Sequence, residues 1–248
     1  MSDSFADCLL PGVPEATVRE ILDRAGGNEI GSGKFASPES SAALAVNGFG
    51  WFLERQEDLP PFPPLIDLDW PATRVDIERQ MRFPWSGGRH PWLDAAVETP
   101  KYLIGVESKR YEPFRDAKTA KLSEAYDRDV WGEGMEPWCT MRDRLRTTPE
   151  TYRLLDAAQL VKHAFGLATE GRRVGKRPIL LYLFAEPTEG RPIAIEKLRA
   201  HRGEVAGFLK AVSSAHVLFA ACSWREWLAT FEGDAADHAA CIVDRFAP

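Results

Sequence analysis

The chain has 248 residues, of which 44% are apolar and 27% charged, a composition typical of globular proteins. Its net charge of −6 gives no sign of a generally basic, nucleic-acid-coating protein, although local basic patches remain compatible with it. It contains no apolar run near the roughly 20 residues of a membrane helix, no secretory-signal pattern at the N-terminus, and no CxxC pair among its four cysteines. We therefore expect a cytoplasmic protein without a membrane segment, disulfide framework or zinc site.

The first part of the chain predicts two helices and a connector. Residues 15–25 suit a short helix that ends at Gly26 and Gly27. A second helix is expected from Ser37, which can cap it, with Pro38 in its first turn and an apolar stripe following. The Pro-rich segment 59–71 suits neither a helix interior nor a central strand, so we expect an extended connector there.

Three strands are predicted next, at residues 73–83, 91–99 and 101–110. Only Thr99 and Pro100 connect the second and third of these, which favours an antiparallel hairpin. Residues 112–150 are polar and show no clear periodicity, so no element is assigned to them.

The second half alternates helices and strands. Periodicity predicts helices over 148–168 and 195–212 and near the end of the chain at 223–231 and 237–246, with buried strands at 177–187 and 215–223. Thr148 and Pro149 are expected to open the first of these helices. The order predicts an α/β fold, in which helices flank both faces of a mixed central β-sheet, and one domain over residues 1–248.

A possible site lies where the predicted hairpin strands pair. Side chains alternate along a strand, so Glu107 and Lys109 share one face, with Gly105 expected to leave room beside them. Pairing across the short connection brings Asp94 close to Glu107. Two carboxylates and one lysine can therefore converge at the end of two neighbouring strands.

Such a group has a chemical use. Two hard oxygen ligands suit Mg²⁺, which keeps several waters and takes one or two protein carboxylates plus phosphate oxygens. The metal can acidify a bound water, and the lysine can orient that water or stabilise charge on a phosphate. The competing interpretation is a solvated ion pair, because an acid and a lysine two residues apart on a strand commonly form one.

At these residues the chain resembles the PD-(D/E)xK nuclease superfamily. The pattern of an Asp on one strand and acid-x-Lys on the next is matched by Asp94 and by Glu107-Ser108-Lys109, thirteen positions apart within the usual range, with Leu93 standing where Pro is common. Four stretches also resemble bacterial proteins identified as restriction endonucleases: SPESSAALAVNGF, PWLDAAVE, IGVESKRYEPF and AAQLVKHAFGL. The resemblance implies a restriction-endonuclease-like core and a DNA endonuclease that uses Mg²⁺, for which Mn²⁺ can substitute. In it, Asp94 and Glu107 would be the metal ligands and Lys109 the residue that serves the attacking water.

The resemblance also suggests supporting residues. Relatives often carry a further acid on the first helix, where Glu39 is the nearest candidate, and Ser41 beside it can bind a phosphate or cap the helix. Glu78 on the first strand is placed to reach the metal region. Gln159 and His163, four residues apart, share a helix face where some relatives hold DNA.

Two alternatives stay open at this point. A non-catalytic DNA-binding protein on the same fold would bind DNA without cutting it. An enzyme of another kind, or a scaffold, would carry the three residues as a surface ion pair. Cutting both DNA strands favours a homodimer, although the sequence shows no interface.

Overall fold

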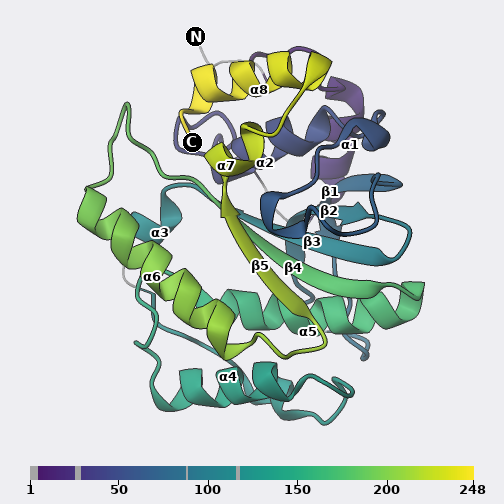
Figure 1. Ribbon diagram of the computed structural model, residues 1–248, viewed down its shortest axis with the longest axis vertical. Coiled ribbons are helices and arrows are strands. Elements are labelled where there is room, and N and C mark those ends of the chain that lie inside the picture. The colour runs from purple at the N-terminus through teal and green to yellow at the C-terminus, as the bar shows by residue number, and fades with distance from the viewer. Residues whose placement is uncertain (1–4, 26–28, 88, 116–117) are drawn as a thin grey trace.

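The computed structural model describes residues 5–25, 29–87, 89–115 and 118–248. At its centre is a five-stranded sheet whose strands lie side by side in chain order (Figure 1). The strands are β1 (Arg74–Gln80), β2 (Trp92–Glu98), β3 (Tyr102–Lys109), β4 (Arg177–Phe184) and β5 (Leu218–Ser223). All five were predicted from the sequence, with ends that differ by at most three residues.

The sheet is mixed. β1 pairs antiparallel with β2, and β2 antiparallel with β3, the second pair across a short connection. β3, β4 and β5 run parallel, and helices α5 (Ala157–Val174) and α6 (Ile195–Ala211) make the crossovers between them. Consecutive elements therefore stay adjacent, and the ends of β3 and β4 meet the start of β2 at one edge of the sheet.

Helices cover both faces of the sheet (Figure 1). One face carries α1 (Glu15–Arg24), α2 (Ser41–Gly50), α7 (Trp224–Leu228) and α8 (Gly233–Phe246), and the other carries α4 (Glu136–Thr147), α5 and α6. The short α3 (Glu112–Arg115) follows β3 directly. Brief 3₁₀ turns occur at Ala6–Cys8, Gln56–Asp58, Pro63–Leu65 and Glu124–Asp127. The expected α/β fold with helices on both faces is confirmed.

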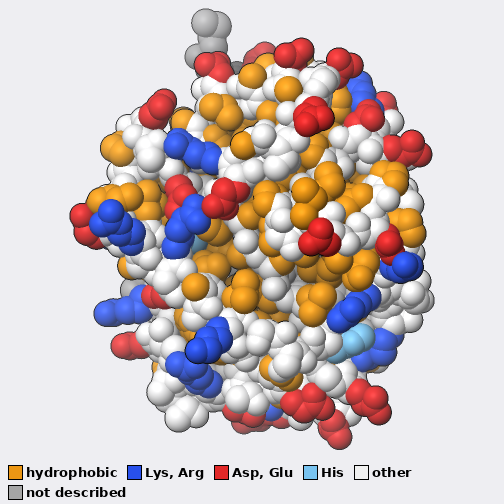
Figure 2. Space-filling view, viewed as in Figure 1, with side chains coloured by type: hydrophobic (Ala, Val, Ile, Leu, Met, Phe, Trp, Pro, Cys, Tyr) orange, Lys and Arg blue, Asp and Glu red, His pale blue; other side chains and the backbone are white. Residues whose placement is uncertain are grey.

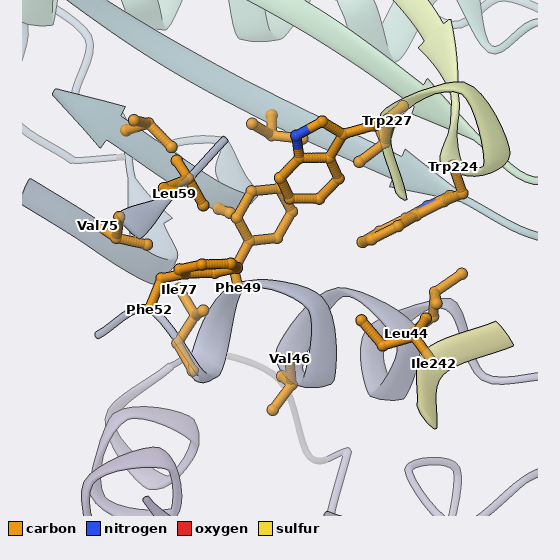
Figure 3. Packing of buried hydrophobic residues seen from close by; sticks show 14 of the residues in the cluster. Leu44, Val46, Phe49, Phe52, Leu59, Val75, Ile77, Trp224, Trp227 and Ile242 are labelled. Atoms are coloured by element: carbon orange, nitrogen blue, oxygen red, sulfur yellow. The ribbon is translucent and has the colours of Figure 1, made fainter. Parts of the chain in front are cut away.

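Each face has its own apolar core. On the α2 side the Phe49 ring stacks on Trp227 with 5.0 Å between ring centroids and meets Trp224 edge-on at 5.9 Å (Figure 3). All three side chains are fully buried, and each buried aromatic of this size removes a large apolar area from water. This packing fixes α2 and α7 against the sheet and so fixes the start of α2 at the sheet edge.

Two predicted helix starts were wrong for the same physical reason. α2 begins at Ser41 and not near Ser37, because the Ser40 side chain accepts the N–H of Ala43 as a cap. α5 begins at Ala157, where Asp156 accepts the N–H of Gln159. In both cases a better-placed capping residue lay inside the predicted helix.

The segment ahead of α5, predicted to be helical from Thr148, is held in another conformation. The Glu204 carboxylate on α6 accepts the N–H groups of residues 153, 154 and 155 at 2.9–3.0 Å. Backbone donors satisfied from outside need no helical partner. The polar region left unassigned contains α3 and α4, and α4 buries Trp138 against the second core.

The predicted helix over 15–25 is confirmed as α1, while Gly26 and Gly27 lie outside the described residues. Among the helices that the structure describes, none is both long and apolar enough to cross a membrane.

Gly105 does not leave room for a site, contrary to expectation. A Cβ at this position would lie 2.3 Å from Leu93 Cδ1 and 2.9 Å from Leu167 on α5. The missing side chain is needed so that α5 can pack closely on β3, which is a structural role.

Candidate active site

Asp94 and Glu107 face each other across the β2–β3 ladder. Ala95 pairs with Val106, so the next position in the same register brings Asp94 opposite Glu107. The N–H of Ser108 donates to Asp94 Oδ2 at 2.6 Å and fixes the orientation of that carboxylate. The strand pairing reasoned from sequence is therefore the pairing observed, and it places the two acids side by side.

Glu107 is 1% exposed and both of its oxygens contact cationic or potentially cationic groups. Lys109 Nζ bonds Oε1, and His163 Nε2 on α5 lies 2.9 Å from Oε2. His163 Nδ1 has no hydrogen-bond partner among the described residues. The carboxylate is thus held from two sides, by its own strand and by the helix that covers it.

The two acids have opposite protonation preferences. Burial raises the pKa of Asp94 well above its ordinary value, and the adjacent Glu107 charge raises it further. Burial alone would also raise the pKa of Glu107, but the charges of Lys109 and His163 outweigh it and bring this pKa to about 2. Without a further cation, Glu107 is therefore the more readily ionised of the two acids.

Lys109 keeps its proton in this setting. Burial alone would lower the pKa of its ammonium, but the nearby Glu107 and Asp94 carboxylates raise it above its usual range. A protonated lysine can hydrogen-bond a water or stabilise negative charge, whereas it cannot accept a proton.

Glu78 on β1 completes the acidic edge. β1 pairs with β2 so that Ile77 and Arg79 flank the position opposite Asp94, which Glu78 occupies. Its φ of +48° lies in the left-handed region, which is strained for a residue with a side chain. Burial, followed by the charges of Glu29 and Glu107, raises the pKa of Glu78 to about 7.

Asp94 and Glu78 line a cleft of about 440 Å³ at this edge of the sheet. Ser41 and Glu112 also line it, and the Ser41 hydroxyl donates to Glu112 Oε1 while the Arg110 N–H donates to Oε2 at 2.9 Å. Ser41 is therefore at the site, as expected, but its hydroxyl is hydrogen-bonded to Glu112. The Glu112 charge also helps to raise the pKa of Lys109.

Glu39 does not lie on a helix. It precedes α2, and its two oxygens are bonded by Arg115 and Arg191, although it also lines the cleft. The structure thus brings Glu39 to the rim of the site with its carboxylate already paired, which does not suit a free metal ligand.

Gln159 and His163 share a face of α5, as their spacing predicts, but occupy different environments. Gln159 lines a second hollow, of about 160 Å³, together with Lys109 and Tyr182. His163 is 2% exposed and contacts Glu107, so it offers no surface on which to hold DNA. Its contact with Glu107 was not predicted, because the packing of α5 on β3 is not visible in spacing alone.

Two other contacts near the site were not predicted from the sequence. Trp224 Nε1 donates to the Ser108 hydroxyl at 3.1 Å, which ties the residue between Glu107 and Lys109 to α7 on the opposite face. Tyr182, paired with Glu107 across β3 and β4, bonds His201 at 2.9 Å. The only signal in the sequence was a hydroxyl side chain inside each apolar strand, Ser108 in β3 and Tyr182 in β4.

The donor set fits a hard divalent cation. Asp94 and Glu107 supply carboxylate oxygens, and a cation between them would offset the burial and the Glu107 charge that raise the pKa of Asp94. Within the described part of the chain, no group of three or more His, Cys, Asp or Glu side chains is arranged to hold a metal. The arrangement therefore suits an ion that keeps several water ligands better than an ion coordinated by protein side chains alone.

The mixed five-stranded sheet, covered by helices on both faces, is a restriction-endonuclease-like core. The chain belongs to the family described as restriction endonucleases associating with ARP, whose model matches residues 5–246. No curated protein and no solved structure matches the chain.

Proposed function

We propose that this protein is a Mg²⁺-dependent DNA endonuclease of the PD-(D/E)xK type, acting in restriction or defence. The observation that carries the proposal is the position of Asp94 directly across from Glu107, with the Lys109 ammonium on the Glu107 carboxylate. Membership of the restriction endonuclease family supports it, and the family description also makes ARP a candidate associate.

In this proposal Asp94, which lines the cleft, and the buried Glu107 beside it hold the metal. When bound, Mg²⁺ would acidify a water and neutralise charge building on the scissile phosphate. Lys109, kept protonated by its two acidic neighbours, would orient that water or stabilise the phosphate oxygens. Ser108 holds Asp94 through its N–H, and His163 holds Glu107 from α5, so that both carboxylates keep their spacing.

DNA would reach the site through local contacts. The face in Figure 2 shows acidic and basic side chains interspersed around apolar surface, without one continuous basic area. The net charge of −6 favours binding through a few positive groups near the cleft and not through a generally basic surface. A homodimer, which cutting both strands would favour, and a cytoplasmic location stay predictions.

One observation favours a second candidate, a DNA-binding protein that does not cut. Both Glu107 oxygens already contact Lys109 and His163, so a metal must compete with these groups for the carboxylate. If that competition fails, the fold would bind DNA in a salt-dependent way without cleaving it.

Calorimetric titration with Mn²⁺ and a DNA-cleavage assay separate the candidates. The nuclease should bind Mn²⁺ and cut DNA, and Asp94→Asn should lose both, while Lys109→Ala should lose cutting and keep binding of the metal. Asp69→Asn, which removes an exposed acid paired with Lys101 at the opposite end of β3, is the matched control and should behave as wild type. Cutting that persists in Asp94→Asn and Lys109→Ala alike refutes the site, and DNA binding without Mn²⁺ uptake favours the second candidate.

A further inference from the structure

Glu39 is held between two arginines from distant parts of the chain. Arg115 at the end of α3 bonds one carboxylate oxygen, and Arg191 in the β4–α6 connection bonds the other. The Arg115 and Arg191 side chains remain 49% and 77% exposed, whereas that of Glu39 is 18% exposed. The two guanidinium groups thus converge on one anionic position while staying open to solvent.

This position is the junction of three hollows. Glu39 lines the cleft of Asp94 and Glu78, a hollow of about 450 Å³ that reaches Arg110 and Arg245, and one of about 410 Å³ beside Phe114. Figure 1 shows the β4–α6 connection, α3 and the C-terminal end of α8 on the same side of the molecule. A strand entering the cleft from this side would pass the Glu39 position.

The geometry of the trio is that of oxyanion recognition. Arginine forks bind carboxylates and phosphates with the same planar arrangement, so a carboxylate between two guanidinium groups occupies a place that a phosphate also fits. Exposed ion pairs contribute little to folding stability, and exchange of Glu39 for another anion should therefore cost little. The Glu39 charge also repels a phosphate for as long as the carboxylate stays in place.

We propose that Arg115 and Arg191 form a binding position for a backbone phosphate of DNA, and that Glu39 occupies this position in the free protein. The inference rests on the proposed function, because it takes DNA as the ligand of the neighbouring cleft. DNA binding displaces the Glu39 side chain, and the two arginines then hold the strand beside the carboxylates.

The test measures binding of a short fluorescent DNA duplex over a range of salt concentrations in EDTA, where cleavage is absent. Arg115→Ala and Arg191→Ala should each weaken binding, and the double variant should reduce the salt slope by about 1, the value for one lost phosphate contact. Glu39→Gln should tighten binding by about two- to ten-fold, because a competing charge at the rim is removed. In the Arg115→Ala, Arg191→Ala double variant, the same Glu39→Gln change should have no effect.

Controls use the exposed Lys101–Asp69 ion pair at the far end of β3. Asp69→Asn changes the net charge as Glu39→Gln does, and Lys101→Ala removes one positive charge as Arg191→Ala does, so both should leave binding near the wild-type value. Equal gains from Asp69→Asn and Glu39→Gln, or a Glu39→Gln gain that survives without the arginines, would show a general charge effect and overturn the proposal.

Competition with inorganic phosphate at constant ionic strength separates a DNA phosphate from a free one. Because the position also fits a free phosphate, the proposal expects at most weak arginine-dependent competition; full displacement of DNA from wild type at phosphate concentrations that leave DNA bound to the double-arginine variant would assign the position to a free anion and overturn it. Unchanged DNA binding by Glu39→Gln would also overturn it while leaving metal-dependent cutting untouched. If wild type and the variants bind DNA as expected here but wild type does not cut DNA with Mg²⁺ or Mn²⁺, the nuclease proposal alone is refuted.

Discussion

His163 Nε2 lies 2.9 Å from Glu107 Oε2, although the two residues come from a helix and a strand that are more than fifty positions apart. The other Glu107 oxygen is bonded by Lys109, so α5 and β3 together determine how this buried carboxylate is oriented. A group that holds a metal ligand without touching the metal commonly affects affinity and rate.

His163→Ala should therefore lower the DNA-cleavage rate by about 10- to 100-fold and weaken Mn²⁺ binding. The variant leaves Glu107 buried with one partner fewer and free to rotate. His163→Gln, which restores a donor of similar reach, should recover part of both losses. Cleavage kinetics and Mn²⁺ calorimetry on the three proteins are the measurements, and wild-type values for His163→Ala would show that the contact has no positioning role.

Glu78 should make stability fall as pH rises. Its folded-state pKa of about 7 lies above the ordinary 4.5, so the folded state binds more protons between these values. The stability that Glu78 contributes through this pKa difference is fully present below pH 4.5 and is lost as the pH rises through 7. In metal-free buffer, Glu78→Gln should be more stable than wild type at pH 8 by on the order of 2 kcal/mol, with a smaller difference at pH 5.

Urea unfolding at the two pH values measures this difference, and a difference that is the same at both would contradict the raised pKa. Glu78→Gly provides a second comparison. It removes the carboxylate and also relieves the left-handed φ of +48°, so it should exceed Glu78→Gln in stability by about 1 kcal/mol.

His201 should weaken the fold in mild acid. Burial, with a smaller effect of Arg202, lowers its pKa from 6.5 to about 4, and its ring is bonded to Tyr182. The unfolded state then binds more protons between pH 6.5 and 4, so stability is full above 6.5 and falls as the pH drops through this window. At pH 5 the loss should be about 2 kcal/mol. The free energy of unfolding of wild type should exceed that of His201→Gln by less at pH 5 than at pH 7.5. Urea unfolding measures this, and a difference independent of pH would contradict the lowered pKa.

Gly105→Ala and Gly203→Ala form a matched pair that tests close packing. A Cβ at Gly105 would meet Leu93 and Leu167 within 3 Å, so Gly105→Ala should destabilise the fold by about 1–3 kcal/mol. Gly203 lies exposed within α6 with nothing within 4 Å of the added atom, and its replacement should stabilise by about 0.5–1 kcal/mol. Thermal unfolding distinguishes the two, and changes of the same sign would refute the packing argument.

The sheet was predictable because its signals are local. Strand-like segments bounded by turn residues predicted all five strands, and the short Thr99–Pro100 connection predicted the antiparallel pairing that brings Asp94 to Glu107. Helix starts were less predictable, since several Ser, Thr and Asp residues compete to cap and tertiary contacts select among them. Ser40, not Ser37, caps α2, and Asp156, not Thr148, caps α5, where Glu204 binds the backbone of the segment between.

The surroundings of the candidate site were less predictable still. Spacing placed His163 on the same face as Gln159, but only the packing of α5 on β3 buries His163 against Glu107. Glu39 was expected on a helix but precedes α2, and its arginine partners come from α3 and from a long connection that no periodicity describes. Contacts between distant segments depend on the assembled fold, which one sequence pattern does not encode.

The middle position of β3 has a consequence for motion. Both of its neighbours are hydrogen-bonded to it, and buried side chains cover both of its faces. Its amide protons should exchange with solvent deuterium only when the whole chain opens, whereas those around Arg191 should exchange through small local fluctuations. The spacing of Glu107 and Lys109 should therefore persist until the whole chain unfolds, while Arg191 at the rim is free to move quickly when a ligand arrives.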